Sequence, residues 1–102
     1  MSGADGGQIV DQRDHRFVLE LDRGVAQLAY RVNGKRLVLI HTEVPEELGG
    51  RGIGGRLVRA AVARAAAEGL TLVPLCPYAR GWLHDHPEES ATVTVDWGTT
   101  PS

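Results

Sequence analysis

The change of hydrophobic period near Pro45 is the feature that most constrains the fold of this chain. Before Pro45, apolar and polar residues alternate with a period of two, which is typical of β-strands. After it comes GGRGIGG, Gly49–Gly55, and from Gly52 to Glu68 apolar residues recur at helical spacing. Strands that lead through a glycine-rich loop into a helix are typical of α/β proteins. We therefore expect a sheet with helices packed on it.

Three strands are predicted before the glycines, over residues 16–22, 24–32 and 35–44. Asn33-Gly34, between the second and the third, is a strong hairpin signal because both residues tolerate positive φ. These strands should therefore form antiparallel hairpins.

The third strand ends in residues that can do chemistry. Leu37, Leu39, His41 and Glu43 are predicted to share one face, and Val38, Ile40, Thr42 and Val44 the other. The strand is apolar on both faces over its first half, so we expect it in the centre of the sheet. His41 and Glu43 would then lie at its C-terminal end, where open α/β sheets bind ligands.

A helix, a strand, a second helix and a last strand are predicted after the loop, over residues 52–68, 70–76, 78–86 and 92–97. Gly69 follows the first helix as a typical C′ residue. The strand after it completes a β-α-β unit and should lie parallel to the third strand. Pro74 lacks an N–H, so that strand should be unpaired on one side there. The predicted order is β-β-β-α-β-α-β, with a mixed, mostly antiparallel sheet and two helices.

The length of 102 residues suits one domain. We expect that domain over residues 15–98, between disordered tails at 1–14 and 99–102, because both ends are polar and bury little apolar surface.

Composition excludes several functional classes. The formal net charge of −2 offers no basic field for nucleic acid. No apolar run approaches the roughly 20 residues of a membrane span, and the first residues lack the basic-then-apolar order of a signal peptide, so a cytoplasmic protein is expected. The single cysteine, Cys76, excludes an internal disulfide and a multi-cysteine zinc site.

The glycine stretch is either a slack connector or a backbone cradle for phosphate. A helix N-terminus carries unpaired N–H groups and a partial positive charge, and Gly52 and Gly54 would leave the approach to it clear. Arg51 adds a positive charge, and Arg56 could add another. No Lys-Ser/Thr follows the last glycine, which excludes a P-loop, and the preceding antiparallel strands fit poorly with a Rossmann fold. The position between a strand and a long helix favours the cradle.

The segment VPEELGGRGIGGRL, residues 44–57, resembles motif A of the GCN5-related N-acetyltransferase (GNAT) family, Gln/Arg-x-x-Gly-x-Gly/Ala. Gly52 and Gly54 match the glycines of that motif, whose amides hold the pyrophosphate of acetyl-coenzyme A (acetyl-CoA). Gly49 stands where the family has Gln or Arg, and Arg51 is a candidate to compensate.

A second segment, LCPYARGWLHDHPE at residues 75–88, resembles a subgroup of very small acetyltransferase-like proteins, the YjdJ type. That subgroup also carries HTEVPEEL, which stands here at residues 41–48. The two motifs together cover about residues 16–88.

The resemblance implies a minimal acyl-CoA N-acyltransferase fold, in which the pantetheine arm lies between two splayed central parallel strands. It implies acetyl-CoA as co-substrate and no metal. The residues implied for cofactor binding are Val44, Gly49, Gly50, Arg51, Gly52, Ile53, Gly54, Gly55, Tyr78 and Trp82.

Acetyl transfer needs a base for the acceptor and an acid for the leaving thiolate. His41 is a candidate base near neutral pH, and Glu43 could orient it or bind a cationic acceptor; both could instead be a solvated strand end. Cys76 should lie on the same sheet edge as His41 and could accept the acetyl group, protonate coenzyme A, or be a buried apolar residue. Tyr78 is another candidate acid.

Three further side chains are interpreted as structural. Trp82 fits the core or a wall of the cofactor slot. His84 and His86 lie only two residues apart and have no cysteine partner at zinc spacing, so they are expected to be solvated.

The sequence therefore predicts an N-acetyltransferase that acts on an amine of a small molecule or a protein, as a monomer or weak dimer. The alternative is a non-catalytic module that binds or senses acyl-CoA, and a third option is a nucleotide or phosphoprotein binding domain. The short connection between the first two strands leaves an acceptor site that is open, shared with a partner chain, or absent.

Overall fold

A computed structural model describes residues 9–12, 15–21, 24–46 and 52–98. The elements are, in order, β1 (Ile9–Gln12), β2 (Arg16–Leu21), β3 (Gly24–Asn33), β4 (Arg36–Glu43), α1 (Ile53–Glu68), β5 (Thr71–Pro74), α2 (Pro77–Asp85) and α3 (Pro87–Ser90). The strands form one sheet in chain order, antiparallel from β1 to β4 and parallel between β4 and β5. The predicted mixed sheet with one parallel pair is confirmed, and α3 is an additional helix.

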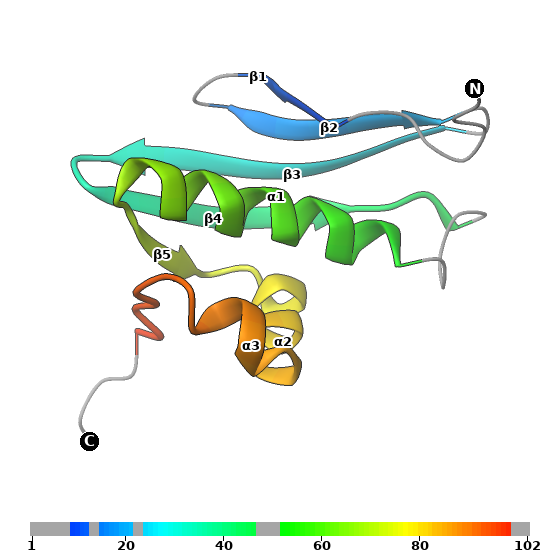
Figure 1. The fold of residues 1–102 in the computed structure, drawn as a ribbon. Helices are drawn as coiled ribbons and strands as arrows, with labels where there is room; N and C mark the ends of the chain where they lie inside the picture. The colour runs from blue at the N-terminus through cyan, green and yellow to red at the C-terminus, as the bar shows by residue number, and fades with distance from the viewer. Residues whose placement is uncertain (1–8, 13–14, 22–23, 47–51, 99–102) are drawn as a thin grey trace.

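Helix α1 lies along one face of the sheet and contacts β2, β3, β4 and β5 (Figure 1). The core between them consists of the inward side chains of the strands, the apolar stripe of α1, and Ala79 and Leu83 of α2. We call the opposite side of the sheet the outer face; it leaves Val10 and Val25 exposed. Among the described residues, no helix is long and apolar enough to cross a membrane.

A β-bulge at Ile40 interrupts β4. Tyr30 pairs with Leu39 and Ala29 pairs with His41, so Ile40 has no partner in β3. One extra residue reverses the alternation of every later side chain on a strand. The prediction that His41 shares a face with Leu37 and Leu39 is therefore wrong.

The bulge reverses which side chains at the end of β4 face α1 and which lie on the outer face. Thr42 pairs with buried Leu28 and so lies on the α1 face. His41 and Glu43 lie opposite Ala29 and Gln27, on the outer face. They share a face with each other, as predicted, but it is not the face of the core.

The predicted N-terminal tail contains a strand. Residues Ile9–Gln12 form β1, which pairs antiparallel with β2, so the interpretation of residues 1–14 as a disordered tail is wrong for these four positions. Asp11 accepts hydrogen bonds from the Tyr30 hydroxyl and from Arg64 Nη1, the latter at 2.9 Å. The Arg64 side chain is only 10% exposed, and a charge with so little water contact needs such partners. Residues 1–8, 13–14 and 99–102 lie outside the described ranges.

The predicted last strand, at residues 92–97, is reduced to one bridge. Val95 pairs in parallel with Leu72, whose N–H donates to Thr94 O and whose carbonyl accepts from Asp96 N–H, both at 2.8 Å. Asp96 also binds Arg36 at 2.6 Å, and this hydrogen bond, together with one from the Gly98 N–H, lowers the pKa of the Asp96 carboxyl. The segment is thus attached to β5 without forming a strand.

The first turn of α1 packs tightly on α2. A Cβ atom on Gly54 would lie 2.7 Å from the ring and hydroxyl of Tyr78, and one on Gly55 would lie 2.4 Å from Trp82 Nε1. Real Cβ atoms do not approach other atoms this closely, so both positions require glycine for this packing. The Trp82 ring also stacks on His86, with the centroids 3.9 Å apart. The ring therefore has little freedom to move away.

We predict that Gly55→Ala lowers the free energy of unfolding by about 1–3 kcal/mol, because the methyl group overpacks the Trp82 contact. Gly54→Ala should lower the free energy of unfolding by a smaller amount, because the half-exposed Tyr78 ring can rotate outward. Urea unfolding followed by circular dichroism measures both. Gly81→Ala is the control: it also lies in a helix, but has no atom within 4 Å of the added Cβ. It should raise stability by about 0.5–1 kcal/mol through helix propensity. Equal effects at Gly55 and Gly81 would contradict the packing argument.

Candidate active site

The parallel strands β4 and β5 separate after a short ladder. Their register runs from Arg36–Thr71 to Leu39–Pro74. Leu39 O then accepts the N–H groups of both Leu75 and Cys76, each at 3.0 Å, and α2 begins at Pro77. Within the described part of the chain, no strand pairs with this edge of β4 beyond Leu39. The predicted splay is present, and it leaves an extended backbone edge at residues 40–43.

The N-terminus of α1 follows this strand end, after the short connection from Glu43. Gly52 is the N-cap residue, with φ +72° and no side-chain hydrogen bond to the helix. An α-helix cannot pair its own first N–H groups, so those of Ile53, Gly54 and Gly55 have no partner within the helix. Together with the helix dipole they favour an anion.

The glycines of the predicted cradle have different roles. No atom of the described residues lies within 4 Å of a Cβ placed on Gly52, so among them only its positive φ favours glycine there. Tyr78 and Trp82 fill the space beside Gly54 and Gly55, as described above. Those two positions serve helix packing and offer a ligand only their backbone amides. Gly49, Gly50 and Arg51, also predicted to bind the cofactor, lie outside the described residues.

Cys76 is buried at the gap between β4 and β5. It is 2% exposed, and its Sγ lies 3.2 Å from Thr42 Oγ1. Thr42, and not His41, is the β4 side chain that reaches it, because the bulge turns His41 to the outer face. The Cys76 thiol, expected on the same sheet edge as His41, therefore lies beside Thr42 instead. Thr42 was missed from the sequence because its inward direction depends on the bulge.

His41 and Glu43 meet on the outer face. His41 Nε2 lies 3.4 Å from Glu43 Oε2, and Gln27 Nε2 donates to Glu43 Oε1 at 2.7 Å. Both members of the His41–Glu43 pair are more than half exposed. An open hollow of about 450 Å³ lies beside them, lined by Val25, His41, Thr42, Glu43, Val44 and Pro45. Val44, predicted to bind the cofactor, contributes to this hollow.

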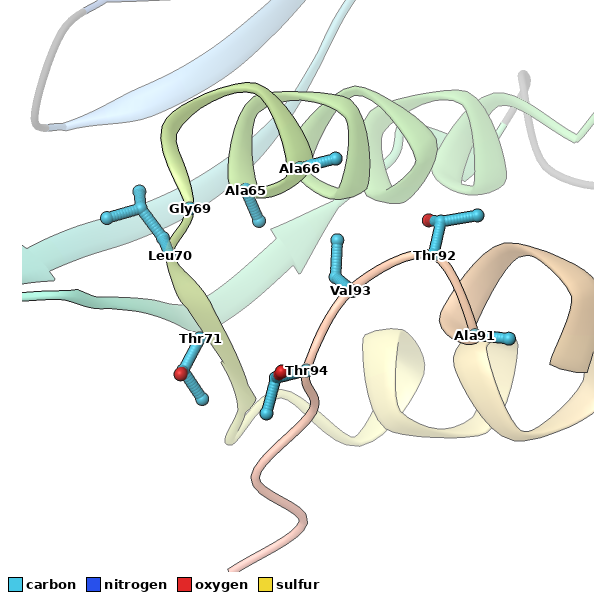
Figure 2. A pocket seen from close by; sticks show the side chains of 9 residues that line it. All are labelled: Ala65, Ala66, Gly69, Leu70, Thr71, Ala91, Thr92, Val93 and Thr94. Carbon is cyan, nitrogen blue, oxygen red and sulfur yellow. The ribbon is translucent and has the colours of Figure 1, made fainter.

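A second hollow, of about 350 Å³, lies at the other end of α1 (Figure 2). Its walls come from the end of α1, the start of β5 and the segment after α3. The lining residues are Ala65, Ala66, Gly69, Leu70, Thr71, Ala91, Thr92, Val93 and Thr94. This lining contains no acid, histidine or cysteine, so it offers no group for proton transfer.

Comparison with known proteins identifies the family. The family model described as GCN5-related N-acetyl-transferase matches residues 16–93. This chain belongs to that family. The Protein NATD1 sequences of Bos taurus and Homo sapiens are each 38% identical to this GNAT chain over 82 residues, covering 76% of it and 71% of the relative. The Protein NATD1 of Gallus gallus is 37% identical over the same length.

A solved structure shares the fold of this GNAT chain. The NMR structure of a GCN5-like protein from Staphylococcus aureus superposes with a TM-score of 0.69 at 25% sequence identity. The match covers 94% of this chain and 93% of the other. The fold expected from the resemblance is thus confirmed, whereas the YjdJ-type subgroup stays a prediction.

Tyr78 of this GNAT domain packs against Gly54 in the first turn of α1. Burial of its hydroxyl, and secondarily the neighbouring Cys76, raise the pKa of Tyr78 above its ordinary value of 10.0. The hydroxyl therefore keeps its proton at neutral pH. The side chain is still 46% exposed, so a ligand at the α1 N-terminus has access to it.

The remaining histidines of α2 and its C-cap have separate partners. His86 Nδ1 lies 2.7 Å from Trp82 O, and the His84 ring approaches Trp97 edge-on at 6.2 Å. Among the described residues, no group of three or more His, Cys, Asp or Glu side chains is placed to hold a metal ion.

We predict that Tyr78 ionises above pH 10, the ordinary tyrosine pKa. Absorbance at 295 nm measures this as the difference between the titrations of the wild type and Tyr78→Phe. Because the folded pKa exceeds the unfolded one, the stabilisation linked to this proton is complete below about pH 10 and is lost as the pH rises through the folded value. A midpoint at or below 10 in the difference titration would contradict the burial of the hydroxyl.

Proposed function

We propose that this protein is an acetyl-CoA-dependent N-acetyltransferase that acts on an amine. The observation that carries the proposal is the convergence of two sets of unpaired backbone groups. The C-terminal end of β4, whose edge is free beyond Leu39, and the N-terminus of α1 lie on the same side of the molecule (Figure 1). Membership of the GNAT family supports the same conclusion.

The chemical parts of acetyl-CoA fit these two features. Its pyrophosphate is a dianion, which suits the first N–H groups of α1 and the clear space at Gly52. Its pantetheine arm is extended and carries two amides, so it can pair with the open edge of β4 as an added strand does. The thioester would supply the acetyl group and a thiol leaving group.

Tyr78 is proposed as the proton donor to the leaving thiol. Its raised pKa keeps the hydroxyl protonated, and it lies against Gly54 in the first turn of α1. Cys76 is the alternative donor, held by Thr42 at 3.2 Å. Its burial argues against an acetyl-cysteine intermediate, so we propose direct transfer to the amine.

His41 is proposed as the base for the acceptor, which would approach from the outer face. One ring nitrogen of His41 faces Glu43, so the other is the one that takes a proton from the amine. The acceptor arrives as an ammonium ion and gives one proton to His41; the freed lone pair of the nitrogen then forms the new bond to the acetyl carbon, the C–S bond breaks, and the remaining extra N–H proton is lost to water. The leaving sulfur then takes its proton from Tyr78. On this proposal, Glu43 orients the imidazole.

We predict that Gly52→Asp weakens acetyl-CoA binding by about tenfold relative to Gly52→Asn. Both side chains tolerate positive φ and cap helices well, so they differ mainly in a negative charge beside the pyrophosphate. Isothermal titration calorimetry with acetyl-CoA gives the two dissociation constants. Equal affinities, or no binding to the wild type, would exclude the α1 N-terminus as the pyrophosphate site.

We also predict that His41→Ala and Tyr78→Phe each lower kcat by about a hundredfold or more, the usual range for one proton-transfer group. Their dissociation constants for acetyl-CoA should stay within about threefold of the wild type. Release of coenzyme A is followed with a thiol reagent, using spermidine and a lysine-containing peptide as acceptors. Tight acetyl-CoA binding without turnover on either amine would favour the non-catalytic acyl-CoA module.

A further inference from the structure

A row of polar side chains crosses the outer face from β1 to β4. Arg16 Nε donates to Gln12 Oε1 at 2.8 Å, and Arg16 Nη1 donates to Gln27 Oε1 at 2.5 Å. Gln27 Nε2 in turn donates to Glu43 Oε1 at 2.7 Å. The row therefore connects a guanidinium on β2 to the carboxylate at the end of β4.

The row fixes the direction of the Gln27 amide. An amide has one acceptor side and one donor side, and here the oxygen faces Arg16 while the nitrogen faces Glu43. The flipped amide would set N–H against the guanidinium and C=O against the carboxylate, so a single orientation satisfies both contacts. Gln27 thereby holds one oxygen of Glu43 and leaves the other, Oε2, beside His41.

The hollow next to this carboxylate combines apolar walls with a negative group. Val25, Val44 and Pro45 form apolar parts of its lining, and His41 and Glu43 form the polar part. Methylene groups that contact such walls are removed from water, which favours binding, and an ammonium group is stabilised by the charge of the carboxylate.

Among the described residues, the charged groups next to the hollow are acidic. Glu20 of β2 stands opposite Val25 in the register, and exposed Glu46 follows Pro45. Arg16, the basic group nearest along the row, is already bonded to Gln12 and Gln27. An anion is therefore disfavoured in this hollow, and a cation is favoured.

We propose that the hollow beside Val25, His41 and Glu43 is the acceptor site, and that it binds the ammonium end of an unbranched aliphatic amine. Glu43, positioned by Gln27, is the counter-ion, and the methylene chain lies on Val25, Val44 and Pro45. The inference rests on the proposed function, because an amine in the hollow would meet the thioester at the free edge of β4. A free polyamine and a lysine side chain of a polypeptide share this chemistry.

The test is an NMR titration of the ¹⁵N-labelled full chain with 1-aminopentane, with and without coenzyme A. The amide signals of Val25, His41 and Val44 should shift, and 1-pentanol and pentanoate, which match the chain length, should bind at least about fivefold more weakly. Shifts confined to the second hollow, at residues 65–71 and 91–94, would overturn the proposal. Equal binding of 1-pentanol would overturn it as well.

Three variants separate the roles of the row. Glu43→Gln keeps the size and the Gln27 contact, and should weaken 1-aminopentane binding about fivefold. Gln27→Leu should weaken it about threefold, with the melting temperature unchanged within about 2 °C because the contact is exposed. Gln12→Leu is the matched control at the far end of the row, and should stay within about 1.5-fold of the wild type. Unchanged affinity in Gln27→Leu would refute the positioning role of Gln27.

Failure of the proposed acceptor site can be distinguished from failure of the proposed function. Acetyl-CoA binding in calorimetry without amine shifts at the hollow would overturn only the acceptor site. Amine shifts at the hollow in a chain that does not bind acetyl-CoA would overturn the proposed function and support the amine site. Spermidine and a lysine dipeptide with blocked termini are then compared, and the tighter ligand identifies the source of the ammonium group.

Discussion

The bulge at Ile40 decides what the end of β4 can do. It adds one residue between the pairs Tyr30–Leu39 and Ala29–His41, so each later side chain lies on the face opposite to the one that simple alternation gives it. Thr42 points into the core and reaches the Cys76 thiol, while His41 and Glu43 point to the outer face. Without the bulge, two exposed polar groups would have to be buried against α1. The same strand therefore serves the gap toward β5 with one set of residues and the outer hollow with another.

The separation of β4 and β5 depends on prolines and on the packing of α2. Pro74 ends the ladder without an N–H, and Pro77 starts α2 directly afterwards. Helix α2 is then held by the contacts of Tyr78 and Trp82 with the first turn of α1, where two glycines allow the rings to approach. The open edge of β4 and the N-terminus of α1 are thus positioned by one interface. A change in that interface would move both.

Most of the fold could be predicted from hydrophobic period and helix ends. The apolar stripe of α1 and the Gly69 at its end predicted both ends of the helix to within one residue. The β-α-β order predicted that β4 and β5 are parallel. Strand β1 could not be predicted, because four residues carry too little pattern. Its strongest anchor is also remote, since Asp11 pairs with Arg64, 53 positions away. The faces of His41, Thr42 and Glu43 were predicted wrongly for a related reason: a bulge follows from the register with β3 and leaves no local mark in the sequence.

The glycine stretch shows why a motif can be recognised before its residues are understood. Gly52 and Gly54 both match the family spacing, yet the structure gives them different physical reasons. Gly52 has a positive φ, and no other part of the described chain approaches a Cβ placed on it, so backbone conformation favours glycine there. Gly54 has ordinary helical geometry and an aromatic ring against it, so lack of space excludes a side chain. A phosphate can approach only the first of these positions without displacing a neighbour. The anion site that we propose is therefore narrower than the motif suggests: it consists of the Gly52 turn and the amides that follow it, with Tyr78 forming one side.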